Sequence, residues 1–343
     1  MEGQDVSLQD VARAAGVSPA TVSRALNGRA GVRDEVRTRV NLVADGLGYR
    51  PNRAAKNLAG GRTSLMALVL GSHELTSDPY ASAIVQSVAK AARQADEGLM
   101  LLLDTQRPNE SVNNLVADGL VEGVIISATA VDQRWVEELL DARMPTVLLG
   151  AHPTRLDVPV VEVENRTSSA RMVGHMLDSG CRRVATIIGD PVRVCTVLRL
   201  DGYRDAHHQR QLEPDPELIF EGDFTYASAR RVADRILAAD VDAVFAGNDE
   251  MATAVIHAAI ERGIDIPNEL SVAGFDGLAL SRLAGMTLST VEQPFDEMAA
   301  RAVSTLVDRI EGLPTPMGQL VDPRLILGST TRSDGSAVRA PTA

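Results

Sequence analysis

The chain has 343 residues, with 34 basic and 46 acidic side chains, a formal net charge of −12 and two cysteines. Its length allows two sizeable hydrophobic cores, and the lack of any run of 18 apolar residues excludes a helical membrane span. With no secretory signal and only two cysteines, we expect a cytoplasmic protein with reduced thiols and no disulfide framework.

Charge is distributed unevenly along the chain. Residues 1–62 carry ten basic and six acidic side chains, a net charge of +4, whereas residues 63–343 carry 24 basic and 40 acidic side chains, a net charge of −16. A basic segment attached to an acidic body favours binding of a polyanion such as DNA through that segment alone. On helical periodicity alone, a small helical bundle with no role in nucleic-acid binding is the alternative.

The first predicted element is a pair of short helices joined by a turn. Ser7 and Asp10 form a capping-box variant that opens the first helix, and Gly16 offers the positive φ that ends it. Ser18 then caps a second helix, in which Pro19 takes the first position, where a missing N–H costs nothing. Two helices around a glycine turn are typical of a helix-turn-helix, whose second helix enters the major groove of DNA.

A third helix is predicted from about residue 34 to residue 46, with Val36, Val40 and Val43 on one side. The motif that runs from Asp10 to Asn27, together with residues 48–59, resembles the head and hinge of the lactose-repressor family of bacterial regulators. The resemblance is specific, because about 50 residues correspond in order and spacing. It continues more loosely through most of the remaining chain.

The resemblance implies which residues meet DNA. The second helix of the head faces base edges in relatives, and Arg24 has the planar fork that suits guanine O6 and N7. Residues 52–61 would form a hinge helix in the minor groove, with Leu58 as an apolar wedge that kinks the duplex. A flexible linker is the alternative, because so short a helix is marginal alone in water. The expected DNA-binding residues are Ser18, Pro19, Ala20, Thr21, Arg24, Asn27, Asn52, Ala55, Lys56 and Leu58.

From about residue 63 the chain alternates short apolar runs with helical stretches. Uninterrupted apolar strands separated by helices indicate parallel sheets that are covered on both faces. We therefore predict an N-terminal all-α helix-turn-helix head with a hinge helix, followed by an α/β core of two parallel-sheet subdomains. The first set of predicted strands comprises residues 65–70, 99–103, 123–126 and 146–149, and the second comprises 184–188, 243–246, 270–273 and 288–291.

The family resemblance implies that this core is a periplasmic-binding-protein-like sensor, with a ligand cleft between its two subdomains. The chain would cross from one subdomain to the other near residues 161, 292 and 322. The expected domains are a DNA-binding head over residues 1–51, a hinge helix over 52–61, an effector-binding and dimerisation domain over 62–331, and a disordered tail over 332–343.

Candidate ligand residues lie after predicted strands, because open parallel sheets bind ligands at the carboxyl ends of their strands. Asp276 and Asn248 each follow a strand of the second set, and the family resemblance implies a ligand-gripping role for Arg199. Carboxylates and amides bind paired hydroxyls, and a guanidinium adds a planar fork. Ordinary alternatives are a core position for Phe224 and helix capping for Asn248 and Asp249. The expected effector-binding residues are Tyr80, Arg199, Phe224, Asn248, Asp249 and Asp276.

Motifs that carry catalysis are missing from the sequence. We find no P-loop, dinucleotide fingerprint, nucleophile elbow or zinc-binding histidine spacing, so we assign no catalytic residue, metal or cofactor and do not expect an enzyme. His207 and His208 indicate a solvated helix edge in preference to a ligand pair. Cys181 and Cys195 are most simply small core residues.

Together these features predict a ligand-responsive transcriptional regulator, a repressor of carbohydrate-utilisation genes that binds a pseudo-palindromic operator as a homodimer. A purine or other non-sugar effector, or activation in place of repression, stays open. A solute-binding protein of a transporter is a distant alternative, since it would carry a secretory signal and lack the helix-turn-helix. The tail is too poor in apolar residues for the coiled coil that tetrameric relatives use.

Overall fold

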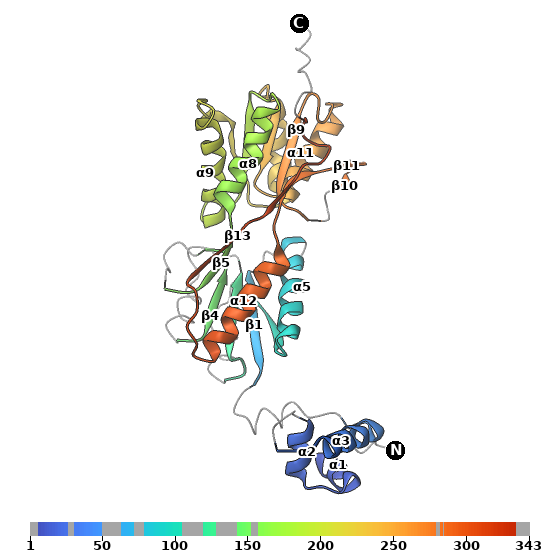
Figure 1. Ribbon diagram of the computed structural model, residues 1–343. Helices are drawn as coiled ribbons and strands as arrows, with labels where there is room; N and C mark the ends of the chain where they lie inside the picture. The colour runs from blue at the N-terminus through green and yellow to red at the C-terminus, as the bar shows by residue number, and fades with distance from the viewer. Residues whose placement is uncertain are drawn as a thin grey trace. The chain divides into compact units, whose positions relative to one another are not determined.

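The computed structural model divides the chain into two compact units, residues 1–63 and residues 64–343. Three helices make up the described part of the first unit, whereas the second unit contains two six-stranded sheets (Figure 1). The predicted helix-turn-helix head and the α/β core of two mainly parallel sheets are confirmed. The structure describes residues 6–26, 31–49, 63–71, 79–104, 119–127, 143–151, 157–278, 282–283 and 285–333.

The first unit begins and ends its helices at the residues that the sequence indicated. The Ser7 hydroxyl accepts a hydrogen bond from the Asp10 backbone N–H at 3.3 Å, and the Asp10 carboxylate accepts one from the Ser7 N–H at 3.0 Å. Gly16 ends the first helix with φ at 65°. The capping box and the left-handed cap are therefore confirmed. The three helices are α1 (Leu8–Ala15), α2 (Pro19–Leu26) and α3 (Asp34–Leu47).

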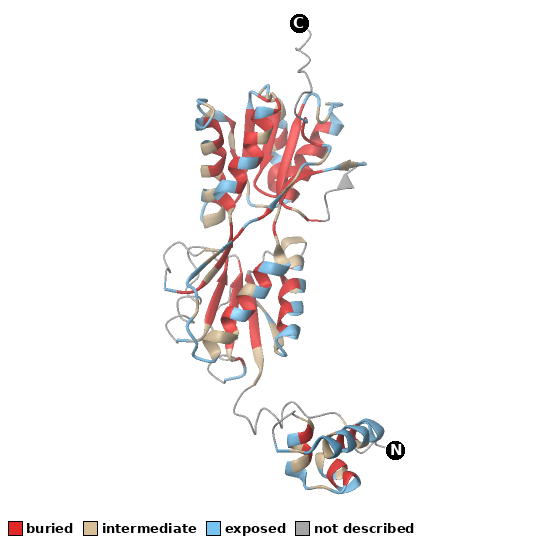
Figure 2. Ribbon diagram, viewed as in Figure 1, coloured by how far each residue is buried: buried red, intermediate tan, exposed pale blue. Residues whose placement is uncertain are grey.

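Small side chains fill the core of the first unit. Alanines and valines from all three helices interlock, which lets short helices approach closely and leaves their outer faces free. Figure 2 shows this core as short buried stretches within largely exposed helices. The buried members are Val11, Ala12, Ala15, Val22, Ala25, Val40 and Ala44.

The first sheet of the second unit has the strand order β13-β5-β4-β3-β1-β2, and each of its strand pairs is parallel. Helices α5 (Pro79–Gln94) and α12 (Phe295–Ile310) pack on it and on each other (Figure 1). Its strands are β1 (Leu65–Gly71), β2 (Gly98–Asp104), β3 (Gly123–Ser127), β4 (Thr146–Leu149), β5 (Val160–Val163) and β13 (Gly318–Val321).

The second sheet has the same plan, with the strand order β14-β12-β9-β8-β6-β7, except that its edge strand β14 runs antiparallel to β12. Its strands are β6 (Val184–Ile188), β7 (Ile219–Glu221), β8 (Ala243–Ala246), β9 (Ser271–Asp276), β12 (Ser289–Glu292) and β14 (Arg324–Ile326). The elements around it are α8 (Asn165–Asp178), α9 (Val194–His208), the 3-10 turn η2 (Pro216–Leu218), α10 (Tyr226–Leu237), α11 (Asp249–Glu261) and the hairpin β10 (Arg282–Leu283) with β11 (Met286–Thr287).

All eight strands predicted from apolar runs are present, with ends shifted by at most a few residues. Four further strands of the two sheets, β5, β7, β13 and β14, were not predicted. Each has three or four residues and includes a polar or charged one, such as Glu162 in β5. Short strands of mixed polarity carry no apolar run, so periodicity does not reveal them.

Three segments carry the chain between the two sheets. The first crossing is Glu164, between β5 and α8; the second is Gln293–Pro294, between β12 and α12; the third is Asp322–Pro323, between β13 and β14. The Glu164 N–H donates to the Val321 carbonyl at 3.0 Å, which ties the first crossing to the third. An ion pair between Arg324 and Glu292 ties the third to the second.

Two sequence interpretations are wrong at single residues. His207 was placed on a solvated edge, but it is buried, with Nδ1 2.9 Å from the Tyr203 carbonyl and its ring beside that of Tyr203. Arg332 was assigned to a disordered tail, but it is buried and donates to the carbonyls of Pro267 and Asn268. In both cases backbone carbonyls satisfy a polar side chain, which composition alone does not reveal.

Candidate functional site

The outer surface of α2 forms the first candidate site, a surface for DNA. Ser18 caps this helix: its hydroxyl accepts a hydrogen bond from the Thr21 N–H at 3.2 Å and lies 2.9 Å from the Thr21 hydroxyl. Val22 and Ala25 are buried, whereas Pro19, Ala20 and Arg24 are exposed on the same short helix. The predicted base-reading residues therefore share a face that the core of the first unit does not use.

The other predicted DNA-binding residues cannot be placed on this surface. The remaining predicted DNA-binding residues, Asn27, Asn52, Ala55, Lys56 and Leu58, lie outside the described residues, as does the hinge segment 52–61. Their roles stay predictions that rest on the family resemblance.

The second candidate site, which we call the effector cluster, lies at the carboxyl ends of the second sheet's strands. Asp276 is the last residue of β9, and Asn248 follows β8. Phe224 follows β7, and Arg199 extends from α9, the helix after β6. The four residues thus lie at or beyond the carboxyl ends of four neighbouring strands, at one edge of the sheet. Open α/β sheets bind ligands at this edge.

Arg199 is the centre of this cluster. Its Nε donates to Oδ1 of Asn165 at 2.8 Å, one of its terminal nitrogens donates to the Gly247 carbonyl, and that nitrogen lies 3.7 Å from the Asp276 carboxylate. The guanidinium carbon lies 3.6 Å from the centre of the Phe275 ring. A buried cation is therefore held in a fixed plane by an aromatic face and by oxygens on its edge.

Asp276 is presented by a strained turn. Its φ is 116°, a conformation that side chains other than glycine seldom adopt, and such strain is retained where the surroundings enforce it. The Gln293 side chain donates to the Asp276 carboxylate at 2.7 Å, and the Gln293 N–H donates to the Asp276 carbonyl at 3.0 Å. Through these two bonds the second crossing holds the carboxylate in place.

Phe224 and Asn248 form a second part of the effector cluster. The Asn248 side chain donates to the Phe224 carbonyl at 2.9 Å, and its oxygen caps α11 by accepting from the Met251 N–H. Asn248 therefore has the capping role that the sequence left open. The Phe224 ring lies so close to Gly189 that a Cβ there would be 2.0 Å from a ring carbon, so only glycine fits.

Asp249 lies behind the effector cluster and is fully buried. Its carboxylate accepts hydrogen bonds from the Leu278 N–H at 2.8 Å and from the Thr290 hydroxyl. Burial, and next the nearby charge of Asp276, raise the pKa of Asp249 well above the usual carboxyl range. In the structure this carboxylate supports the turn that follows Asp276.

Sequence reasoning missed several polar residues that complete the effector cluster. Glu162 and Asn165 lie on either side of the first crossing, both buried, and the Asn165 amide donates to Glu162 at 2.8 Å. Burial raises the pKa of Glu162. Arg193 lies beside Phe224, with its guanidinium carbon 5.7 Å from the ring centre. Gln293 had a detectable signal, since it follows a predicted strand as Asp276 does.

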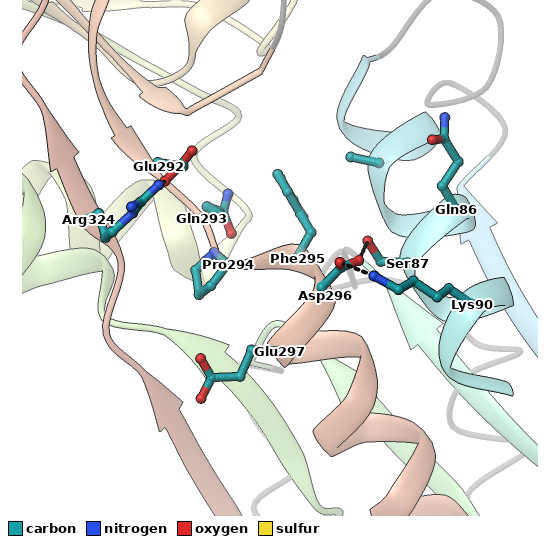
Figure 3. A pocket seen from close by; sticks show the side chains of 11 residues that line it. Gln86, Ser87, Lys90, Glu292, Gln293, Pro294, Phe295, Asp296, Glu297 and Arg324 are labelled. Carbon is teal, nitrogen blue, oxygen red and sulfur yellow. Dashed lines mark hydrogen bonds and ion pairs between the residues drawn. The ribbon is translucent and has the colours of Figure 1, made fainter. Parts of the chain in front are cut away.

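Tyr80 lies on α5, in the subdomain of the first sheet. Its ring meets that of Phe295 edge-on at 5.6 Å, beside a hollow of about 780 Å³ that Figure 3 shows. In this hollow the Asp296 carboxylate accepts from Ser87 at 2.9 Å and from Lys90 at 2.6 Å, which fastens α12 to α5. The hollow borders the second and third crossings. Arg199 and Asp276 are not among the residues that line it.

The effector cluster offers hydrogen-bonding groups and aromatic faces more than reactive ones. Carboxylate, amide and guanidinium groups suit a polyhydroxy ligand or a heterocycle. Among the described residues, no group of three or more His, Cys, Asp or Glu side chains is arranged to hold a metal ion. Within the same residues, no helix combines the length and the apolar character that crossing a bilayer requires.

Comparison with protein families divides the chain as the structure does. The model described as bacterial regulatory proteins, lacI family, matches residues 7–52. The model described as periplasmic binding protein-like domain matches residues 173–331. The chain is 34% identical over 327 residues to the HTH-type transcriptional regulator CelR of Thermobifida fusca, covering 92% of this chain and 95% of that protein.

Solved structures show the same similarity over nearly the whole chain. A transcriptional regulator CelR–cellobiose complex superposes with a TM-score of 0.74 at 30% identity, covering 95% of this chain and 99% of the other. The lac repressor dimer bound to operator and the anti-inducer ONPF superposes with a TM-score of 0.78 at 26% identity, covering 96% of this chain and 100% of the other.

Proposed function

The chain belongs to the lacI family of bacterial regulatory proteins. We propose that it is a repressor of carbohydrate-utilisation genes and that a small-molecule effector controls its affinity for DNA. The observation that carries the effector part is the buried Arg199–Asp276 pair at the carboxyl edge of the second sheet. The two groups are paired with each other and with neighbouring protein groups, and they lie at the edge where open α/β sheets bind ligands.

On the DNA side, the protein acts as a homodimer on a pseudo-palindromic operator. The head, residues 1–51, reads bases with the exposed face of α2, and the hinge, residues 52–61, enters the minor groove with Leu58 as its wedge. The lac repressor relative is described as a dimer on operator, which supports this arrangement. Because the proposed target is chromosomal DNA, we place the protein in the cytoplasm.

On the effector side, the domain over residues 62–331 binds a sugar or sugar derivative. Asp276, Asn248 and Arg199 take hydroxyl pairs, and Phe224 and Tyr80 offer aromatic faces to sugar C–H surfaces. The structure of a relative is described as a cellobiose complex, which supports this class of ligand. For Asp249 we assign an indirect role, because its carboxylate is bonded to Leu278 and Thr290.

Two alternatives follow from particular side chains. Arg193 and Arg199 both lie within 6 Å of the Phe224 ring, at 5.7 and 5.9 Å, and this arrangement also suits a planar purine stacked on the aromatic ring. Activation in place of repression is the other alternative. An enzymatic role has no support, since the relatives are transcriptional regulators.

The test begins with selection of an operator from random duplex DNA by the purified full chain. Sugars, including cellobiose and maltose, and purine bases are then screened by thermal shift, because a ligand at 100 times its Kd adds about 2.7 kcal/mol to stability. We expect a sugar to raise the Tm and to change operator affinity in fluorescence anisotropy. A shift with a purine and none with any sugar would replace the proposed effector class.

A matched pair of variants then locates the effector. Asp276→Asn removes the carboxylate at the carboxyl edge of the second sheet, whereas Asp242→Asn removes one at the opposite edge, where it accepts from the Arg182 and Arg183 N–H groups. We expect effector affinity to fall at least about tenfold in Asp276→Asn. Equal losses in both variants would mean that the effector does not contact Asp276.

A further inference from the structure

Buried polar side chains form a continuous series of contacts between the first and second crossings. Glu162 accepts from the Asn165 amide at 2.8 Å, and the Asn165 oxygen accepts from Arg199 at 2.8 Å. Arg199 lies 3.7 Å from Asp276, which accepts from the Gln293 side chain at 2.7 Å. All five residues are buried, with at most 7% of their surface exposed.

The first link of this series spans the first crossing. Glu162 is the third residue of β5, in the first sheet, and Asn165 is the first residue of α8, which packs against the second. Glu162 also accepts from the Ala151 N–H at 2.6 Å, just beyond β4. A change in the angle of the chain at Glu164 must therefore stretch or break the bond between Glu162 and Asn165.

The last link fastens the start of the second crossing to the second sheet. Gln293 makes both a side-chain bond and a backbone bond to Asp276, and Pro294 follows at once and leads into α12. The other bonds described between crossings, from Glu164 to Val321 and from Arg324 to Glu292, contain no residue of the effector cluster. The series of contacts through Arg199 thus differs from these bonds, because it joins two crossings through residues of the effector cluster.

We propose that Glu162 and Asn165 are positioning residues that hold Arg199 at a point fixed by both crossings, so that a ligand on Arg199 or Asp276 changes the geometry of both. The Asn165 side chain is essential to this arrangement, because its amide group donates to Glu162 while its oxygen accepts from Arg199. The link to a ligand rests on the proposed function, whereas the coupling of the two crossings does not.

A reversal of the hydrogen-bond direction tests the coupling. Asn165→Asp places two carboxylates face to face and breaks the first link. In the double variant Glu162→Gln with Asn165→Asp, the new amide donates to the new carboxylate, which still accepts from Arg199, so one negative charge remains in the pair. Thr186→Val is the control, since it removes another buried hydrogen bond of the second sheet, from Thr186 to the Phe245 carbonyl.

Amide hydrogen exchange of the full-length protein without ligand provides the measurement. The Glu164 N–H donates to Val321 of the first sheet and the Gln293 N–H donates to Asp276 of the second sheet, so their exchange reports loosening of the backbone at the first and second crossings. We expect exchange in Asn165→Asp to rise at least about tenfold at Glu164 and also at Gln293, and to return toward wild type in the double variant. Thr186→Val should leave both amides unchanged.

Other outcomes overturn the proposal. Faster exchange at Glu164 alone would mean that the first crossing opens without the second. Failure of the double variant to restore exchange would mean that packing, and not the hydrogen bond, holds the crossing. Titration with cellobiose is a separate arm: if wild-type protein responds, Asn165→Asp should weaken the effect of cellobiose on operator affinity. Absence of a wild-type response bears on the effector class alone, because the exchange experiment uses no ligand.

Discussion

Helix α2, which we propose reads DNA, and the effector cluster place their candidate functional side chains in opposite environments. On α2, Pro19, Ala20 and Arg24 are exposed on a helix whose other side is buried. In the effector cluster, Arg199 and Asp276 are buried and bonded to other protein groups. In the head, the side chains proposed to read DNA are therefore separate from the core, whereas in the effector cluster the same contacts would serve both stability and the proposed ligand binding.

The partner explains this difference. Duplex DNA is large, so a protein reads it with side chains that project from a surface. A small ligand is instead surrounded, and the groups that meet it must be oriented in advance by neighbours. Buried polar groups are tolerated only when they are paired, and here the pairs are Arg199 with Asn165 and Asp276 with Gln293.

The largest expected effect comes from Arg199→Ala. Removing this cation leaves Asp276 buried without its ion pair, and breaking a buried pair costs about 3–5 kcal/mol. We expect urea unfolding of the second unit to shift by that amount and the effector response to disappear. Head variants should show no such loss of stability. A change below about 1 kcal/mol would mean that the effector cluster is as independent of stability as the head is.

Arg24→Ala tests the other side of the comparison. Loss of one guanidinium fork should cost about 1–3 kcal/mol at a single base pair in each half-site and relax specificity there. The unfolding free energy should stay unchanged, because Arg24 is exposed. Anisotropy titrations against operators altered at each position give the measurement. Uniform weakening across all of these operators would show a phosphate contact in place of base reading.

Asp249→Asn sharpens the comparison through pH. Because the folded pKa of Asp249 is raised, the folded protein keeps a proton that the unfolded chain has released above the ordinary carboxyl range. Wild-type stability should therefore fall as pH rises toward the folded pKa. Asparagine mimics the protonated acid, so the variant should gain about 1–2 kcal/mol over wild type between pH 6 and pH 8.

Urea unfolding at the two pH values measures this gain. Asp242→Asn is the control, since the Asp242 carboxylate accepts backbone N–H bonds at the opposite edge of the second sheet. A wild-type stability that follows the same pH profile as Asp249→Asn would mean that Asp249 is ionised in the folded protein at both pH values.

Ser7→Ala has the smallest expected effect. It removes the hydroxyl of the capping box, which costs about 1 kcal/mol of helix stability. We expect a lower melting temperature for the first unit, with weaker operator binding only where the head is partly unfolded. The effector response measured by thermal shift of the second unit should not change. A change in that response would show that the two units do not melt independently.

Much of the fold could be predicted because its elements have local signals. Capping at Ser7, the left-handed Gly16 and eight apolar runs each depend on neighbours in sequence, and the structure contains them all. The unpredicted strands depend on distant partners. Strand β13, for example, contains Gly318 and Gln319 and is defined by its pairing with β5.

The candidate site divides along the same line. Asp276 and Asn248 were predictable because they follow strands, and Arg199 because its surroundings resemble a known family. Glu162 and Asn165 gave no signal, since a carboxylate and an amide beside a strand usually face solvent. Only the meeting of β5, α8 and α9 buries them and gives each a partner.

Strands β13 and β14 have a consequence for synthesis on the ribosome. Among the residues that the structure describes, they are the last strands to be translated, yet β13 completes one edge of the first sheet and β14 one edge of the second. The first unit is complete once residue 63 has emerged, whereas both sheets wait for residues beyond 318. A nascent chain therefore carries a complete head long before its second unit is complete, and until then β5 and β12 are exposed as unpaired edge strands, which are prone to pair with other chains.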